Sequence, residues 1–350
     1  MDGLSIGVIG CGYWGSKHVR VLQGVAGVER VVPIDAQPER LAEMARAYPS
    51  LASSCFHDLE AAIDHIDAAV VATPPNTHSA VALSLLQAGK GALVEKPLAT
   101  SVAAADALID AAAAYGATLM TGHTFEYNAA VWKLRELIEM GDLGELHYID
   151  GARLNLGLYQ SDVNVVWDLA PHDVSIFNHL LQATPTAVQA WAERHAHPEL
   201  EDVAHLRLEY GSRDLSADIH VSWLDPCKVR RTTVVGDRRM VVYNDLSENE
   251  RIRLFDKGVM HDRAAGPRVS YRYGDTVVPY IEFHEPLAYQ DQHFVNCVIN
   301  GSSPATDGES GRAVVAVLEA AQVSIREHRK VTIEEVHSRG DATVEMGVGS

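Results

Sequence analysis

Ile6-Gly7-Val8-Ile9-Gly10-Cys11-Gly12-Tyr13-Trp14-Gly15 is the stretch that decides the fold of this chain. A β-branched run ends in Gly-x-Gly-x-x-Gly, and a helical apolar pattern follows from His18 to Leu22. Gly10 permits a tight turn, Gly12 leaves room for a phosphate, and Gly15 lets the helix pack closely on the strand. The helix then directs N–H groups and its positive dipole end at a pyrophosphate. The motif alone would also fit an ordinary strand–helix turn, but its context predicts dinucleotide binding.

Asp35 lies 20 residues after Gly15 and closes the second apolar run, Val31 to Ile34. A carboxylate at this position can accept hydrogen bonds from both hydroxyls of an adenosine ribose. Its charge repels a 2′-phosphate, so the sequence favours NAD over NADP as the cofactor. Capping of the following helix is an alternative role for Asp35, and the two roles are compatible.

Composition limits the classes of protein that this chain can be. Its 350 residues suggest two domains, and 47% hydrophobic with 22% charged residues is typical of a soluble globular protein. A net charge of −18 without a basic stripe argues against nucleic-acid binding. No apolar run approaches the roughly 20 residues that cross a bilayer, and we expect no secretion signal before the first strand, because neither a basic nor an apolar leader pattern is seen there. The four scattered cysteines fit a reduced cytoplasm and provide no disulfide or metal framework.

The first part of the chain alternates buried apolar runs with helical segments. After Asp35, strands are expected at 68–72, 92–95 and 118–121, and helices at 39–48, 78–88 and 102–115. Repeated strand–helix units predict a doubly wound parallel sheet, the Rossmann architecture, whose ligands bind at the carboxyl ends of the strands. Besides the glycine turn and Asp35, that rule selects the segments Thr73-Pro74-Pro75-Asn76, Glu95-Lys96-Pro97 and Gly122-His123 as walls of one crevice.

The pattern changes after a helix at 129–140. Strands are expected at 146–152, 187–193, 203–210, 215–221, 229–235, 240–244 and 251–255. One helix near Pro171 to Leu181 interrupts them, residues 266–279 read as a loop, and helices at 284–300 and 308–329 close the chain. We therefore expect a Rossmann domain over 1–123, an α+β domain with a large, mostly antiparallel open sheet over 124–336, and a mobile tail over 337–350.

Two short segments could carry chemistry. Lys96 ends a buried strand, where a lysine is costly unless it is paired or functional; the alternative is a surface lysine that opens a loop. In Trp167-Asp168-Leu169-Ala170-Pro171-His172-Asp173, a helix that starts near Leu169 would place Asp168 and His172 on one face. Such a pair can pass a proton near neutral pH, although Asp168 could also merely cap the helix.

Taken together, these motifs resemble the Gfo/Idh/MocA family of nicotinamide-dependent sugar and cyclitol oxidoreductases. The resemblance covers nearly the whole chain and is carried by Gly10 to Gly15, Ala72 to His78, Glu95 to Ala99, Gly122-His123 with Tyr127-Asn128, and Asp168 with His172. It implies hydride transfer between nicotinamide C4 and a secondary alcohol of a sugar, sugar phosphate, nucleotide sugar or cyclitol. It also implies a homodimer or homotetramer formed through the C-terminal sheet, and a Lys96–Pro97 bond that is often cis in relatives.

The resemblance assigns roles to individual residues. His172 would be the general base, Lys96 would hold the substrate oxygen, and Asp168 would orient one of them. Further substrate contacts would come from Tyr127, Arg153, Asn155 and Asn164. Cofactor contacts would come from Gly10, Gly12, Tyr13, Trp14, Gly15, Asp35, Thr73, Pro74, Asn76, His78, Glu95, Lys96 and His123. An NAD-retaining isomerase or glycosidase-like enzyme and a non-catalytic dinucleotide sensor remain as alternatives.

Overall fold

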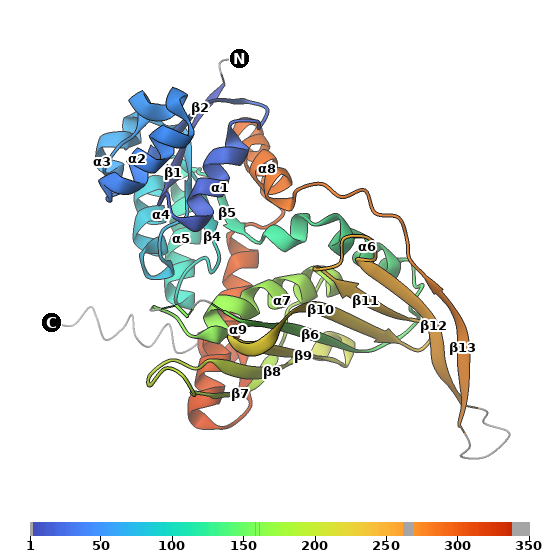
Figure 1. The fold of residues 1–350 in the computed structure, drawn as a ribbon. Helices are drawn as coiled ribbons and strands as arrows, with labels where there is room; N and C mark the ends of the chain where they lie inside the picture. Colours follow the sequence, from blue (N-terminus) through green and yellow to red (C-terminus); the bar gives the residue numbers. More distant parts are fainter. Residues whose placement is uncertain (1–2, 158, 161, 262–268, 338–350) are drawn as a thin grey trace. The chain divides into compact units, whose positions relative to one another are not determined.

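The computed structural model describes residues 3–157, 159–160, 162–261 and 269–337, and its helices and strands are drawn in Figure 1. These residues form two compact units. Unit 1 contains the described residues up to Tyr127 together with His284–Ala316, and unit 2 contains Asn128–Phe283 and the described residues from Val317 onward. The expected tail lies outside the described residues, apart from His337.

Unit 1 is built on a five-stranded parallel sheet, which confirms the predicted doubly wound architecture. Its strand order is β2-β1-β3-β4-β5, and every residue of β3, β4 and β5 is buried, as expected for strands covered on both faces. The strands are β1 (Leu4–Ile9), β2 (Val28–Ile34), β3 (Ala68–Val71), β4 (Gly91–Glu95) and β5 (Leu119–Gly122). The helices between them are α1 (Tyr13–Leu22), α2 (Pro38–Ala47), α3 (Leu59–Ala62), α4 (His78–Gln87) and α5 (Val102–Tyr115).

A segment from near the end of the chain completes unit 1. Helix α8 (Pro286–Asn300) contributes Leu287, Phe294 and Val295 to the same hydrophobic core that holds Val19 and Leu22 of α1. Residues 284–316 therefore belong with unit 1, which departs from the uninterrupted second domain expected over 124–336. The helix expected at 284–300 forms as α8 from Pro286 onward, but no local pattern identifies α1 as its packing partner.

Unit 2 is built on a nine-stranded sheet in the order β13-β12-β11-β10-β6-β9-β8-β7-β14. Its neighbours are antiparallel except for β6 and β9, which confirms the predicted mostly antiparallel sheet. The strands are β6 (Leu146–Leu156), β7 (Ala187–Glu193), β8 (Val203–Tyr210), β9 (Leu215–Ser222), β10 (Leu224–Gly236), β11 (Met240–Asn244), β12 (Ile252–His261), β13 (Val269–Val277) and β14 (Val331–Thr332). The helices are α6 (Ala129–Glu139), α7 (Val165–Leu181) and the part of α9 (Gly308–Glu327) from Val317 onward.

Alternating side chains give the sheet of unit 2 two different faces. On β9, Ala217, Ile219 and Val221 are buried on the face that α7 covers, while Asp218 and His220 between them are only half-buried. Helices α6 and α7 both pack on this first face (Figure 1). We call the opposite surface of the sheet the open face; it includes His205 and His220, whose rings stack.

Two expectations for unit 2 are wrong, one in the start of a helix and one in the type of an element. Helix α7 begins at Val165, not near Leu169, because Asn164 accepts hydrogen bonds from the Val166 and Trp167 N–H groups and caps the helix there. Residues 269–277, expected within a loop, form β13, which pairs with β12 at the edge of the sheet. Residues 266–268 lie outside the described residues. An exposed edge strand lacks the buried alternation that reveals other strands.

Candidate active site

The glycine turn between β1 and α1 has the shape that a pyrophosphate requires. Gly10 has a φ of +88°, and a Cβ there would lie 2.7 Å from the Ala72 carbonyl oxygen. A Cβ on Gly15 would lie 1.7 Å from the Gly10 carbonyl oxygen, so only glycine fits at both positions. A Cβ on Gly12 would meet no described atom within 4 Å, which leaves open space at the N-terminus of α1. This open cradle fits the phosphates of a dinucleotide.

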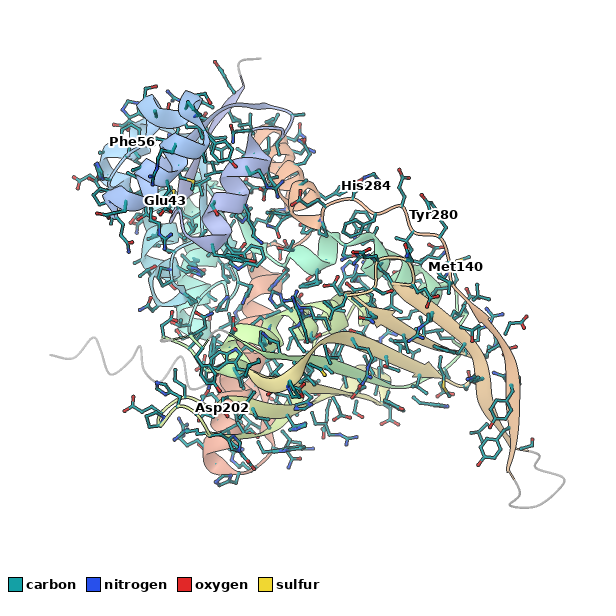
Figure 2. The ribbon with its side chains drawn as sticks, in the orientation of Figure 1. Glu43, Phe56, Met140, Asp202, Tyr280 and His284 are labelled. Carbon is teal, nitrogen blue, oxygen red and sulfur yellow. The ribbon has the colours of Figure 1, made fainter. Side chains whose placement is uncertain are left out.

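The expected cofactor residues around this turn differ in exposure. Tyr13 and Trp14 form the first helical turn and are exposed, with their rings edge to face at 5.5 Å. Asp35 is half-buried at the end of β2, where its Oδ2 accepts the Cys11 N–H at 2.7 Å and its Oδ1 accepts the Gln37 N–H at 2.8 Å. The Asp35 carboxylate is thus tied to the glycine turn itself. The nearby cation Arg40 pairs with Glu43, labelled in Figure 2, at 3.3 Å.

His78 links the ends of two neighbouring strands. Its Nδ1 lies 2.8 Å from the Pro97 carbonyl oxygen and its Nε2 lies 2.8 Å from the Thr73 carbonyl oxygen. The ring is buried, and burial lowers the pKa of His78, although the Pro97 and Thr73 carbonyl oxygens oppose this shift. This expected cofactor residue therefore braces the loops after β3 and β4, whereas Pro74 and Asn76 of the same expected set are exposed beside it. The Lys96–Pro97 bond within the second loop is cis.

Glu95 is the last residue of β4, and Lys96 follows it at the carboxyl edge of the sheet. Lys96 is half-buried, and its backbone N–H donates to Glu95 Oε2 at 3.2 Å. The other Glu95 oxygen, Oε1, lies 3.0 Å from Nε2 of His18 on α1. Nδ1 of His18 in turn lies 2.9 Å from Asp291 Oδ2 on α8. Two carboxylates thus flank one imidazole, and one of them, Glu95, is the chain neighbour of the candidate catalytic lysine.

His18 carries a positive charge in this arrangement. Both ring nitrogens face carboxyl groups, and only the imidazolium can donate to both of them. Burial by itself would lower the pKa of His18, but Asp291 and Glu95 together raise it to about 10. Burial opposes the charge of Glu95 as well, yet His18 and then Lys96 hold the pKa of Glu95 below its usual value. The sequence analysis did not predict this cluster. The one indication of it in the sequence is His18, a polar residue on the apolar face of α1.

The segment after β5 contributes buried groups to unit 1. The His123 side chain is 1% exposed, and neither ring nitrogen has a hydrogen-bond partner among the described residues. Burial lowers the pKa of His123, partly offset by the charges of Glu126 and Glu95. Tyr127, expected to contact substrate, instead belongs to the core of unit 1, and its hydroxyl lies 3.0 Å from Thr306 Oγ1.

Unit 2 places Asp168 and His172 one turn apart on α7, so both lie on one face of the helix, as predicted. Both side chains are partly exposed. Asp168 Oδ2 accepts a hydrogen bond from the indole Nε1 of Trp223 at 2.9 Å. Sequence reasoning missed Trp223, because it lies 55 residues away from Asp168.

The other expected substrate residues of unit 2 have structural partners. Arg153 is 4% exposed, and its Nε donates to Asp173 Oδ2 at 3.0 Å, so a substrate anion would compete with a buried ion pair. Burial disfavours the charge of Arg153, but Asp173 more than compensates and raises its pKa. The Asn164 amide nitrogen donates to Glu201 and to Gln322, and its oxygen accepts the two cap hydrogen bonds. Asn164 thus has its full set of four hydrogen bonds within unit 2. Asn155 lies two residues beyond Arg153 on β6 and is half-buried.

None of the helices in the described part of the chain has the length and apolar character that crossing a bilayer requires.

Comparison with known proteins identifies the family to which this chain is similar. Residues 4–123 match the model of an oxidoreductase family with an NAD-binding Rossmann fold, and residues 131–242 match a GFO/IDH/MocA C-terminal domain. D-apiose dehydrogenase of Paraburkholderia graminis is 23% identical over 98% of this chain and 93% of that protein. Inositol 2-dehydrogenase of Rhodococcus erythropolis is 31% identical over 67% of this chain and 70% of that protein.

A solved structure is similar to this chain over nearly its whole length. GenD2 from gentamicin A biosynthesis, crystallised in complex with NAD, superposes with a TM-score of 0.79 at 25% identity and covers 95% of this chain and 97% of its own. Both family models match this chain, and the glycine cradle and the residues at the strand ends agree with them. We conclude that this chain is a member of the Gfo/Idh/MocA family of oxidoreductases.

Proposed function

We propose that this protein is an NAD(H)-dependent oxidoreductase that interconverts a secondary alcohol and a ketone on a sugar or cyclitol. The observation that carries the proposal is the placement of Lys96 after β4, one strand away from β3, whose end contacts the glycine turn through Ala72. Ligands of doubly wound sheets bind at this edge. The names of the relatives, an apiose dehydrogenase and an inositol dehydrogenase, support the substrate class.

The proposed mechanism divides the work between the two units. Bound NAD would supply the hydride acceptor, held by the glycine cradle with Asp35 on the adenosine ribose. His172 takes the proton of the substrate hydroxyl as general base, because a partly exposed imidazole can exchange protons near neutral pH. Lys96 donates a hydrogen bond to the same substrate oxygen and stabilises its developing negative charge. Asp168, one helical turn before His172, orients the imidazole or the lysine.

An assay with NAD and a panel of cyclitols, sugars and sugar phosphates tests this function. We expect NADH absorbance to appear with at least one polyol and to vanish when the matching hydroxyl is blocked. A purified protein that already carries nicotinamide and shows no net NADH formation would favour an isomerase. Absence of turnover with every polyol, together with measurable NAD binding, would favour a sensor.

Substitution of Asp35 tests the cofactor preference. Asp35→Ala is expected to weaken NAD binding about 10- to 100-fold, because hydrogen bonds to a charged group are lost. NADP binding is expected to weaken much less or to improve, because the negative charge that opposes a 2′-phosphate is gone. Titration of both dinucleotides measures this, with the exposed Asp64→Ala variant as a control. Equal weakening for the two dinucleotides would show that Asp35 acts only on the glycine turn.

We also propose that the protein is cytoplasmic and forms a homodimer or homotetramer through the open face of unit 2. The four cysteines are free thiols, as a reduced compartment allows. On the open face, Tyr148 is 44% exposed and Trp191 is 54% exposed, and the Trp191 ring stacks on His205 at 5.3 Å. Exposed aromatic patches mark interaction surfaces.

The double variant Tyr148→Asp with Trp191→Asp is expected to have the mass of a monomer in sedimentation, whereas the unaltered protein sediments as a dimer or tetramer. Tyr280→Asp, which alters a tyrosine that is 91% exposed on the segment after β13 (Figure 2), serves as the control. Identical masses for the double variant and the unaltered protein would place the interface elsewhere.

A further inference from the structure

Trp223 joins strands β9 and β10, and its side chain is 1% exposed. An indole is only a hydrogen-bond donor, and a buried indole N–H needs an acceptor. Here the acceptor is Oδ2 of Asp168 at 2.9 Å. We propose that Trp223 is a positioning residue that holds the Asp168 carboxylate in one orientation beside His172. This inference rests on the function proposed above, in which Asp168 orients the proton-transfer groups.

Both the backbone and the ring of Trp223 are held by neighbouring segments. The Trp223 backbone N–H donates to the Asp202 carbonyl oxygen at 2.9 Å, and its carbonyl oxygen accepts the Gly157 N–H at 2.9 Å. The Tyr159 ring packs on the indole at 5.2 Å, and the Tyr159 hydroxyl donates to the Asp202 carboxylate. Asp202, labelled in Figure 2, is fully buried. The donor is thus fixed by segments that lie far apart in the sequence.

Gly157 shows how closely these segments pack. A Cβ at this position would lie 3.1 Å from Cδ1 of Trp223, tighter than ordinary van der Waals contact. The turn that ends β6 therefore leaves no free space for a side chain at position 157 beside the indole.

The hydrogen bond from Trp223 affects the orientation of the Asp168 carboxylate on α7. A partly exposed aspartate can rotate about its side-chain bonds, and each rotamer points its charge in a different direction. A buried donor on Oδ2 selects one of these orientations. Catalytic groups must be held within roughly 0.5 Å of their productive geometry, and supporting hydrogen bonds of this kind provide the restraint. Trp223 acts on the reaction through Asp168 and need not touch substrate or cofactor.

Trp223→Phe tests the inference because it keeps an aromatic ring in the core and removes the N–H donor together with part of the ring volume. Loss of one hydrogen bond to a charged group is expected to lower kcat about 10- to 100-fold. The KM for NAD should change less than about 2-fold, because unit 1 binds the cofactor. Trp132→Phe, on the exposed side of α6, is the matched control and should retain full turnover.

A double-mutant cycle separates positioning from general structural support. In an Asp168→Ala background the indole has no carboxylate to hold, so adding Trp223→Phe should change kcat by less than about 2-fold. If Trp223→Phe lowers kcat as strongly in the Asp168→Ala background as it does when Asp168 is present, the inference is overturned. Normal turnover in the single variant Trp223→Phe would also overturn it. Normal turnover in Asp168→Ala would instead refute the proposed role of Asp168. Urea unfolding of all four proteins reports any loss of folded protein.

Discussion

Lys96→Ala is expected to lower kcat by about 10²- to 10⁴-fold while NAD binding is retained. The side chain follows β4 at the ligand-binding edge of the parallel sheet, and its ammonium would stabilise charge that develops on the substrate oxygen. The pyrophosphate cradle is formed by other residues, above all Gly10, Gly12 and Gly15, so removal of the amine should leave it intact. Stopped-flow turnover and calorimetric NAD titration measure the two quantities separately.

Two companion variants sharpen this result. Lys96→Arg keeps a positive charge but replaces a compact amine by a planar guanidinium that does not deprotonate, so it should restore little of the lost turnover. His172→Ala should cause a loss of similar size, about 10²- to 10⁴-fold, because the general base is removed. Lys133→Ala, a surface lysine of α6 paired with Glu136, should leave kcat unchanged. Full activity of both Lys96→Ala and His172→Ala would refute the assigned roles.

His18→Ala is expected to destabilise the protein by about 3–5 kcal/mol at pH 7. The change removes the imidazole that bridges Glu95 and Asp291, so two buried carboxylates lose their shared cation. Urea unfolding of the variant against the unaltered protein measures the free energy of unfolding. His57→Ala, an exposed histidine of the same unit, should change it by less than about 0.5 kcal/mol. A loss below about 1 kcal/mol for His18→Ala would show that the carboxylates are neutral.

The same cluster predicts how stability depends on pH, without any substitution. The pKa of His18 is raised to about 10 in the folded protein, above its ordinary value of 6.5. The folded state therefore keeps a proton that the unfolded chain has released between these values. The stabilisation is fully present below pH 6.5 and is lost as pH rises through about 10, at up to about 1.4 kcal/mol per pH unit. Urea unfolding between pH 6 and 10 should show this decline, and a flat profile would contradict a charged His18.

The local sequence determined the dinucleotide-binding half of this protein. The turn from Gly10 to Gly15 could be read directly, because backbone freedom and the absence of a Cβ are properties of the residues themselves. The buried apolar runs predicted the parallel strands for a similar reason, since both faces of such strands are covered. The rule that ligands bind at strand ends then selected Asp35 and Lys96 without knowledge of any contact.

Only the tertiary structure decided which polar groups are partners. His18 and Asp291 are 273 residues apart, and Trp223 meets Asp168 across 55 residues, so no periodicity within either segment could reveal these pairs. Asn164 and Tyr127 looked like substrate contacts in sequence, but the fold uses one as a helix cap and buries the other in a core. A buried polar side chain must find a partner, and the identity of that partner is a property of packing in space, which a local pattern of residues does not contain.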